Sequence, residues 1–298
     1  MKQSQALDTD WMRSLGAGDP PSHESLREHL LAVHREHPGF TESCAMRCRD
    51  DEGRTSYEWL VDLVRPDEHA HVVDLACGSG PLLELCHRRF GGALELTGID
   101  MSHEELDLAR RRLPHGAASL HRSLADDLGF VPDGGVDVML CHWALTLMDP
   151  VAPVLEEANR VLRPGGTFAA VIDGDMALSP GYEAVHHVIY GWVQREFPCF
   201  GRVDLGDARV RDGGSLACLS EATFHAATVT VDSSVFSLSG PPDMVAREAA
   251  GFFYAAFVLS PPSHRLMLAE LEDFFAREAQ GGSARFDMPI NRLVVHRR

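Results

Sequence analysis

The sequence has little positive charge for its length. Its 298 residues contain 27 Lys and Arg against 44 Asp and Glu, which gives a formal net charge of −17. Proteins that bind nucleic acids or anionic membranes take much of their affinity from clustered Lys and Arg. The densest basic run, residues 110–112, lies in an amphipathic pattern typical of a solvated helix face. We therefore expect neither a nucleic-acid partner nor a membrane partner.

The sequence also lacks long apolar runs and paired cysteines. No run reaches the roughly 18 apolar residues of a membrane span, and the first 15 residues lack the apolar core of a secretory signal. The seven cysteines are odd in number, scattered and without a C-x-x-C pair. This usage argues against a disulfide framework and favours a reducing, cytoplasmic compartment. Cys44 and Cys48 could share a helix face, but no second pair of ligands is nearby, so we expect no metal site there.

The hydrophobic pattern predicts an α/β fold. Apolar runs typical of buried strands alternate with amphipathic segments typical of helices. We expect strands at residues 71–75, 94–99, 119–122, 136–141 and 167–172, and helices at 81–89, 103–113 and 149–162. This alternation implies a doubly wound, mostly parallel sheet that binds its ligand outside the carboxyl ends of the strands. Helices are expected before residue 66 and at about 174–200 and 241–280, with two more strands at 228–238 and 292–296.

A glycine-rich turn follows the first expected strand, in the sequence VVDLACGSGPLL of residues 72–83. Gly78 and Gly80 allow the backbone to approach a ligand, and the next helix presents free N–H groups. A dinucleotide site would need a third glycine where Leu83 stands. The carboxylate of Asp74 would repel a pyrophosphate but suits a ligand with a sulfonium and an ammonium group.

The second expected strand ends in Gly-Ile-Asp, which places Asp100 twenty residues after Gly80. A carboxylate at this position can accept hydrogen bonds from both hydroxyls of a ribose. Met101 follows and could pack on the face of an adenine. The alternative is that Asp100 only caps a helix, a role for which Ser102 is the better candidate.

Four ordered motifs resemble those of the class I S-adenosylmethionine-dependent methyltransferases. They are DLACGSG at 74–80, GIDMS at 98–102, DVMLCH at 137–142 and RPGG at 163–166, and the resemblance covers roughly residues 68–173. It implies a Rossmann-like seven-stranded sheet, mostly parallel with an antiparallel last strand, and S-adenosylmethionine as the cofactor. One departure is Ala76, which stands where the family often has its first glycine.

The resemblance also implies the residues that contact the cofactor. Its adenine-binding loop corresponds to the sequence LADDLGF, in which Asp127 followed by Leu128 is the preferred match; these acids could also be exposed loop charges. In relatives a helix before the first strand closes over the methionine moiety, where Arg54 could hold the carboxylate and Tyr57 could hydrogen-bond. A plain capping and core role for this segment is about as plausible. The expected cofactor-binding residues are Asp74, Ala76, Cys77, Gly78, Gly80, Asp100, Met101, Asp127, Leu128, Cys141, Arg54 and Tyr57.

Methyl transfer needs an aligned nucleophile and, for many acceptors, a base. His142 ends the fourth expected strand and is the first candidate base or substrate-orienting group, because imidazole titrates near neutral pH. It could instead only brace the loop. His186 is a second candidate; it and His187 point about 100° apart on a helix, so at most one faces a pocket. A metal would need a third ligand such as Asp173 or Asp175, and none is expected.

The sequence thus predicts an enzyme that transfers a methyl group to an O, N or C atom of a small-molecule metabolite, in natural-product metabolism. We expect a helical lid at residues 1–66 and a cofactor-binding domain at 67–298, with lid insertions at about 174–215 and 241–280. Aromatic residues of these insertions could line the substrate pocket. A protein methyltransferase and a non-catalytic S-adenosylmethionine-binding protein stay open. So does a homo-oligomer, since the helix DTDWMRSLGA could pack on a second copy.

Overall fold

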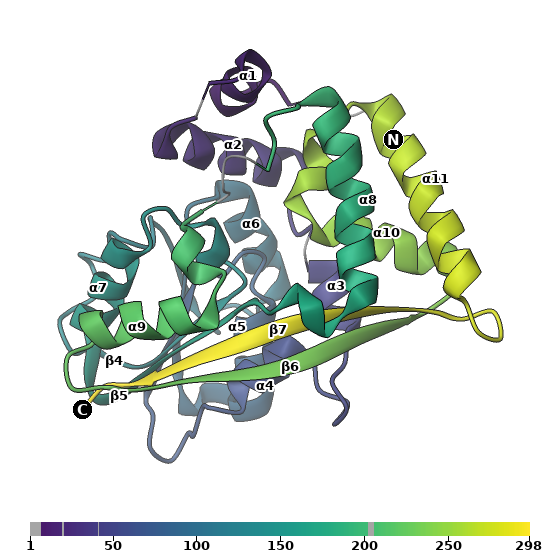
Figure 1. The fold of residues 1–298 in the computed structure, drawn as a ribbon. Helices are drawn as coiled ribbons and strands as arrows, with labels where there is room; N and C mark the ends of the chain where they lie inside the picture. Colours follow the sequence, from purple (N-terminus) through teal and green to yellow (C-terminus); the bar gives the residue numbers. More distant parts are fainter. Residues whose placement is uncertain (1–6, 20, 41, 202–205) are drawn as a thin grey trace. The chain divides into compact units, whose positions relative to one another are not determined.

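The five expected central strands are five of the seven strands of one sheet in the computed structural model (Figure 1). The structure describes residues 7–19, 21–40, 42–201 and 206–298. The side chains of β1, β2 and β4 are almost all buried, as expected for strands covered on both faces. The five strands pair in parallel. Their bounds are β1 His71–Leu75, β2 Glu95–Asp100, β3 Ser119–Arg122, β4 Val136–His142 and β5 Leu162–Asp173.

Two long strands complete the sheet, which has the order β3-β2-β1-β4-β5-β7-β6. Strand β7, Ala284–His296, runs antiparallel to β5, and β6, Thr228–Gly240, is the edge strand. The predicted fold class, a mostly parallel seven-stranded sheet with an antiparallel last strand, is confirmed. The last strand is longer than the expected 292–296, because alternate residues from Phe286 to Ile290 are buried despite Pro289. Proline normally argues against a strand interior, which hid this half of β7.

The chain divides into two compact units. The first consists of Met1–Thr55, Asp175–Asp204 and Val235–Pro289, and the second of Ser56–Gly174, Leu205–Ser234 and Ile290–Arg298. Strands β6 and β7 have residues in both units. The second unit holds strands β1–β5 and the glycine-rich turn. The expected lid segments fall largely in the first unit, although residues 1–6, 20, 41 and 202–205 of those segments lie outside the described residues.

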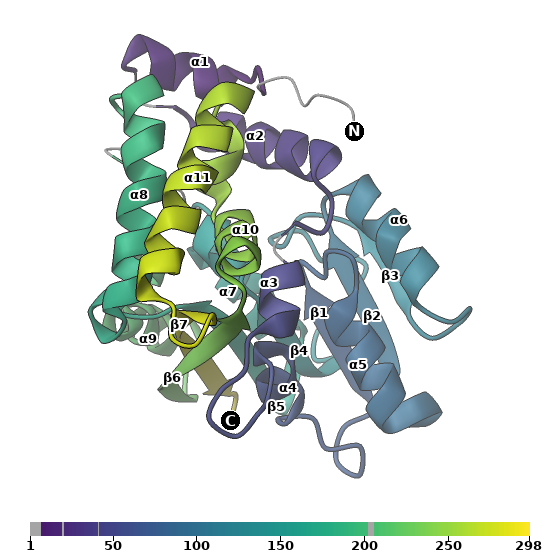
Figure 2. The same cartoon turned by 90° about the vertical axis from the view of Figure 1, so that its right-hand side faces the viewer.

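Helices cover both faces of the sheet in the second unit. Figure 2 shows α4, α5 and α6 on one face, while α7 and α9 pack against each other on the opposite face. A core of aliphatic and aromatic side chains, among them the fully buried Phe168 and Phe224, lies between β4, β5 and the helices α7 and α9. The helix bounds are α4 Ser56–Val61, α5 Pro81–Phe90, α6 His103–Arg112, α7 Ala152–Val161 and α9 Gly213–Thr223.

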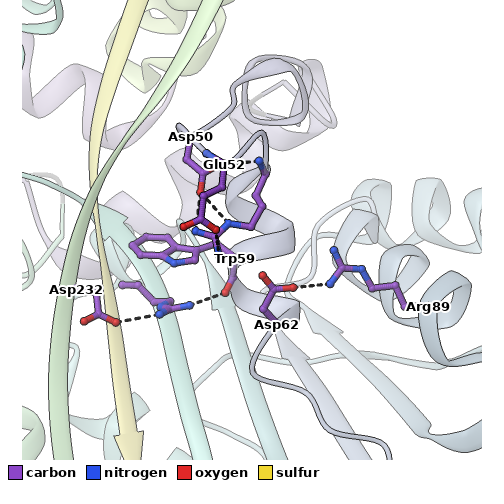
Figure 3. Close-up of polar contacts among 8 residues, drawn as sticks. Asp50, Glu52, Trp59, Asp62, Arg89 and Asp232 are labelled. Carbon is purple, nitrogen blue, oxygen red and sulfur yellow. Dashed lines mark hydrogen bonds and ion pairs between the residues drawn. The ribbon is translucent and has the colours of Figure 1, made fainter.

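Helix α4 falls in this second unit, which begins at Ser56. The guanidinium of Arg292 on β7 lies 4.3 Å from the Trp59 ring and donates to the Trp59 carbonyl at 2.7 Å. Arg292 also pairs with Asp232 on β6 (Figure 3). At the other end of α4, Asp62 accepts a hydrogen bond from Arg89 of α5. These contacts attach α4 to the sheet.

The first unit is helical. Its helices α8 and α11 lie side by side (Figures 1 and 2), and the Trp192 indole of α8 donates to Glu270 of α11 at 2.8 Å. The expected N-terminal helix already has a partner within the chain, because Trp11 is buried and stacks on His29 at 4.6 Å. The helix bounds are α1 Asp10–Ala17, α2 His23–Glu36, α3 Glu42–Arg47, α8 Pro180–Glu196, α10 Pro242–Phe252 and α11 Pro261–Glu278.

Hydropathy separates these helices from transmembrane segments. In the part of the chain that the structure describes, no helix combines the length and the apolar character that crossing a membrane requires.

Gly98 in β2 tests the close packing beside the glycine-rich turn. A Cβ built on Gly98 would lie 2.6 Å from Leu83, 2.7 Å from Leu120 and 3.0 Å from the Cys77 sulfur. We predict that Gly98→Ala lowers the free energy of unfolding by about 1–3 kcal/mol, the usual cost of overpacking a core. Urea denaturation measures this change.

Gly92→Ala is the matched control, because a Cβ at Gly92 would meet nothing within 4 Å. This substitution should leave the free energy of unfolding within about 0.5 kcal/mol of wild type. Equal unfolding free energies for the two variants would contradict the packing described for β2.

Candidate cofactor and active site

The glycine-rich turn between β1 and α5 takes a backbone path that few residues adopt. Gly78 and Gly80 have φ values of +51° and +81°, and Ala76 also has a positive φ, +57°. A Cβ at Gly80 would lie 3.1 Å from the Cβ of Ala109 on α6, so only glycine lets the turn pack closely there. The turn therefore brings backbone N–H groups to the carboxyl edge of the sheet, as the sequence predicted.

Asp74 is a buried carboxylate without a full set of partners. The residue is 1% exposed, and its Oδ2 accepts no hydrogen bond from any described residue. Burial raises the pKa of Asp74 well above its ordinary value, and the neighbouring Asp100 raises it further. A buried ionised carboxylate is costly unless a cation or a hydrogen-bond donor meets it. The position thus favours a ligand that brings positive charge.

Asp100 is held against the same turn. One of its carboxylate oxygens accepts the Gly78 N–H at 2.8 Å, and the other accepts the Ser102 N–H at 2.8 Å. Ser102 itself caps α6 by accepting the Glu105 N–H. Asp100 therefore fixes the turn while Ser102 takes the capping role. Because each carboxylate oxygen has a second lone pair, Asp100 can still accept hydrogen bonds from a ligand.

Glu105 is a third acid beside the turn, and the sequence analysis missed it. The residue is 1% exposed, and a Cβ on Gly78 would lie 3.8 Å from its Oε2. Its sequence signal was present, since Ser102 and Glu105 have the spacing of a capping box, but that pattern indicates only a helix start. Together the three acids make the turn unfavourable for a phosphate and favourable for a cationic group.

The other expected cofactor residues differ in what they expose. Cys77 and Cys141 are buried beside the turn and at the end of β4, and burial together with Asp74 raises the pKa of Cys141 to about 12. Met101 is half-buried. Asp127 is exposed, whereas the side chain of Leu128 is fully buried in the core. The N–H of Leu128 donates to Glu157 and its carbonyl accepts from Arg160, so its backbone groups are already paired.

His142 lies at the carboxyl end of β4 in a closely packed setting. Its Nε2 and the Ser56 hydroxyl are 2.8 Å apart, and its ring stacks on Tyr57 with the centroids 3.8 Å apart. Burial lowers the pKa of His142 to about 3. The imidazole is therefore neutral at neutral pH, a state in which it braces α4 against β4. Ser56, the first residue of α4, is the partner that fixes this ring.

Arg54 and His186 belong to the first unit. The Arg54 guanidinium binds Asp50 at 2.8 Å and Glu52 at 3.2 Å, so its charge is compensated within its own turn (Figure 3). His186 stacks on Tyr190 with ring centroids 3.8 Å apart. Their expected contacts with cofactor and substrate stay predictions.

Comparison with known proteins defines the class. Residues 73–170 match the family model described as a methyltransferase domain. The chain is 35% identical over 111 residues to a demethylmenaquinone methyltransferase of Symbiobacterium thermophilum, covering 35% of this chain and 42% of that protein. It is 31% identical over 163 residues to a ubiquinone/menaquinone biosynthesis C-methyltransferase of Desulfotalea psychrophila, covering 54% and 62%. The chain thus spans about half the length of these curated relatives.

Solved structures share the fold. The [4+2]-cyclase SpnF is 16% identical with a TM-score of 0.56, covering 93% of this chain and 97% of that one. The YcgJ protein of Bacillus subtilis is 15% identical with a TM-score of 0.54, covering 82% and 98%. The fold and the family model together identify residues 73–170 as a methyltransferase domain.

Asp74→Asn should stabilise the ligand-free protein at high pH. The raised pKa of Asp74 means that the folded state binds its proton more tightly than the unfolded state does. As pH rises above the pKa that Asp74 has in the unfolded state, the free energy of unfolding of wild type therefore falls. The loss is on the order of 1 kcal/mol for each pH unit between the unfolded-state and folded-state pKa values. The uncharged amide avoids that loss, so the advantage of Asp74→Asn should grow from pH 5 to pH 8.5 in urea denaturation.

Asp137→Asn provides the contrasting control. Asp137 accepts the N–H groups of Ala70 and His71 and pairs with Arg163, and these contacts hold its pKa below the ordinary value. Its ionised form stabilises the fold above the unfolded pKa, so Asp137→Asn should destabilise the protein at pH 7. A loss of stability in Asp74→Asn at pH 8.5 would contradict the description of Asp74.

The His142 imidazole should not titrate between pH 5 and pH 8. Its lowered pKa reflects the removal of the ring from water, which disfavours the imidazolium. In ¹⁵N-detected NMR spectra its ring signals, assigned by their loss in His142→Gln, should stay in the neutral form over this range. A His142 midpoint near 6.5 would contradict the burial described here.

Proposed function

We propose that this protein transfers a methyl group from S-adenosylmethionine to an O, N or C atom of a small-molecule metabolite. The observation that carries the proposal is the buried Asp74 carboxylate, whose Oδ2 has no described partner, beside Asp100 and the glycine-rich turn. When bound, S-adenosylmethionine supplies a methyl group on a sulfonium, which is a good leaving group. Its ammonium group also offers a positively charged partner for the Asp74 carboxylate.

Each residue of the turn has a part in holding this cofactor. Asp74 pairs with the ammonium group, and this positive charge stabilises the ionised form of the Asp74 carboxylate. Asp100 accepts the ribose hydroxyls while it keeps the Gly78 N–H in place. The backbone of Gly78 and Gly80 allows close approach. Met101 and Asp127 contact the adenine side, and Cys77 and Cys141 line the buried floor.

The acceptor is proposed to be a mid-sized metabolite of specialised metabolism. Of the two named relatives, one is a demethylmenaquinone methyltransferase and the other a ubiquinone/menaquinone biosynthesis C-methyltransferase. The expected lid segments are proposed to enclose the acceptor, with His186 as a catalytic candidate, and Arg54 is proposed to hold the carboxylate of the cofactor. The aromatic side chains of Phe253 and Tyr190 around His186 suit a planar or apolar acceptor.

Isothermal titration calorimetry with S-adenosylmethionine tests the cofactor half of the proposal. Wild type should bind, and Asp100→Ala should weaken binding by on the order of 1–3 kcal/mol, or roughly fivefold to 150-fold, because a buried hydrogen-bond acceptor is lost. The exposed Asp175→Asn should bind like wild type. No binding by wild type, or equal affinities for wild type and Asp100→Ala, would remove this turn from the function.

Transfer of an isotope-labelled methyl group tests the catalytic half. A panel of reduced demethylmenaquinone, phenols, primary amines and an acidic peptide separates small-molecule from protein acceptors. Label on a small molecule supports the proposal. Label only on the peptide would assign a protein methyltransferase, and cofactor binding without any transfer would indicate a non-catalytic binder or a different reaction on the methyltransferase fold.

A further inference from the structure

Asp173 lies at the carboxyl end of β5, on the other side of β1 from Asp100. Asp74 pairs in register with Leu140, and Leu140 pairs with Ala169. Asp173 is four residues beyond Ala169, about 13 Å farther along the strand at roughly 3.3 Å per residue. It therefore stands past the cofactor turn, at the edge where ligands of parallel sheets bind. An acceptor has to meet the methyl group on this side if Asp100 holds the ribose.

The Asp173 carboxylate is held by one neighbour and keeps one oxygen available. Its Oδ1 accepts a hydrogen bond from the Trp143 indole Nε1 at 3.0 Å. Among the described residues, Oδ2 accepts no hydrogen bond, and the side chain is only half-buried. Asp173 is thus a positioned carboxylate with one oxygen that no described residue occupies.

Trp143 takes an unusual backbone conformation to make this contact. Its φ is +56°, a region that bulky side chains rarely adopt because of steric strain. The strand pairing holds it there, because the Trp143 N–H donates to the Val171 carbonyl of β5 at 2.9 Å. Strain of this kind collects at functional sites, where the surrounding structure maintains it. At this position it directs the indole toward Asp173.

The electrostatic setting suits proton transfer. Burial raises the pKa of Asp173, while the Trp143 hydrogen bond and the charge of Arg211 partly oppose the rise. His142, which directly precedes Trp143 and ends β4, carries no charge at neutral pH. A carboxylate with a raised pKa is a better base near neutral pH than an ordinary Asp. His142, by contrast, has its Nε2 hydrogen-bonded to Ser56 and a lowered pKa, so it is poorly placed to accept a proton.

We propose that Asp173 is the general base for the acceptor and that Trp143 is its positioning residue, an inference that rests on the proposed methyl transfer. The X–H proton of a hydroxyl, amine or acidic carbon acceptor passes to Oδ2 of Asp173. The electron pair of X forms the X–CH₃ bond, and the electron pair of the broken S–CH₃ bond stays on sulfur as S-adenosylhomocysteine forms. Asp173 later gives the proton to water.

NMR of the Trp143 indole tests the geometry without any acceptor. The chain has four tryptophans, so the Trp143 indole N–H signal can be assigned from its loss in Trp143→Phe. Its chemical shift should follow the ionisation of Asp173 with a midpoint above that of an ordinary Asp, and the transition should vanish in Asp173→Asn. A Trp143 signal that shows no transition, or a midpoint at the ordinary Asp value, would overturn the proposal.

Kinetics with the acceptor that wild type methylates tests the chemical role. Asp173→Asn keeps an oxygen for the Trp143 N–H but cannot accept the proton, so kcat should fall by about 10²- to 10⁴-fold while the Kd for S-adenosylmethionine stays unchanged. Trp143→Phe removes the donor that favours the carboxylate, so the rising limb of the pH–kcat profile should move to higher pH. Asp173→Glu should restore part of the rate. The exposed Asp175→Asn, two residues away, should match wild type.

The outcomes separate this inference from the function on which it rests. Undiminished kcat in Asp173→Asn, with wild type active, overturns the role of Asp173 alone. An equal loss of cofactor binding and rate in Asp173→Asn would also overturn it, since that pattern marks a structural residue. A wild type that binds S-adenosylmethionine but methylates no acceptor contradicts the proposed methyl transfer and the role of Asp173 with it.

Discussion

The site depends on negative charge that the chain buries at the carboxyl edge of β1 and β2 and does not itself fully compensate. Asp74 is almost fully buried with an unpartnered oxygen, and Asp100 adds a second charge that raises the pKa of Asp74. A protein seldom tolerates this arrangement unless a ligand relieves it. Asp137 on the neighbouring strand shows the contrast, because two backbone N–H groups and Arg163 satisfy it, and its pKa is lowered.

Two titratable side chains at the ends of β4 and β5 have pKa values that are shifted in opposite directions, and these shifts suit them to different roles. Burial lowers the pKa of His142, which keeps the imidazole neutral. Burial also raises the pKa of Asp173, which brings that pKa closer to neutral pH. The same physical cause, loss of water around a charge, acts in opposite directions on a base and an acid. His142 thereby becomes a stable support for Ser56 and Tyr57, and the proton-accepting role moves one strand along the sheet.

The sequence predicted the features that local rules encode. The alternation of strand and helix, the glycines at positive φ and the acids that end β1 and β2 all follow from short-range patterns, and the structure has them. It predicted less well what depends on packing across the fold. The position of α4 depends on Arg292, which contacts Trp59 from more than 230 residues away, and Pro289 concealed half of β7. The pKa of His142 and the Trp143–Asp173 contact depend on neighbouring strands, which no single segment reveals.

Under the proposed function, the sheet edge divides into a cofactor half at β1 and β2 and an acceptor half at β4 and β5. On the β2 side, the turn, Asp74 and Asp100 form a site that selects its ligand by charge. These residues are not proposed to take part in the chemical step. On the β4 and β5 side, the strained Trp143 and the second oxygen of Asp173 are proposed to govern what happens to an acceptor. A change at Asp173 can thus abolish transfer while the cofactor still binds. Only a few of the acidic residues behind the net charge of −17 are buried at this edge of the sheet. Most of the surplus negative charge lies at the surface.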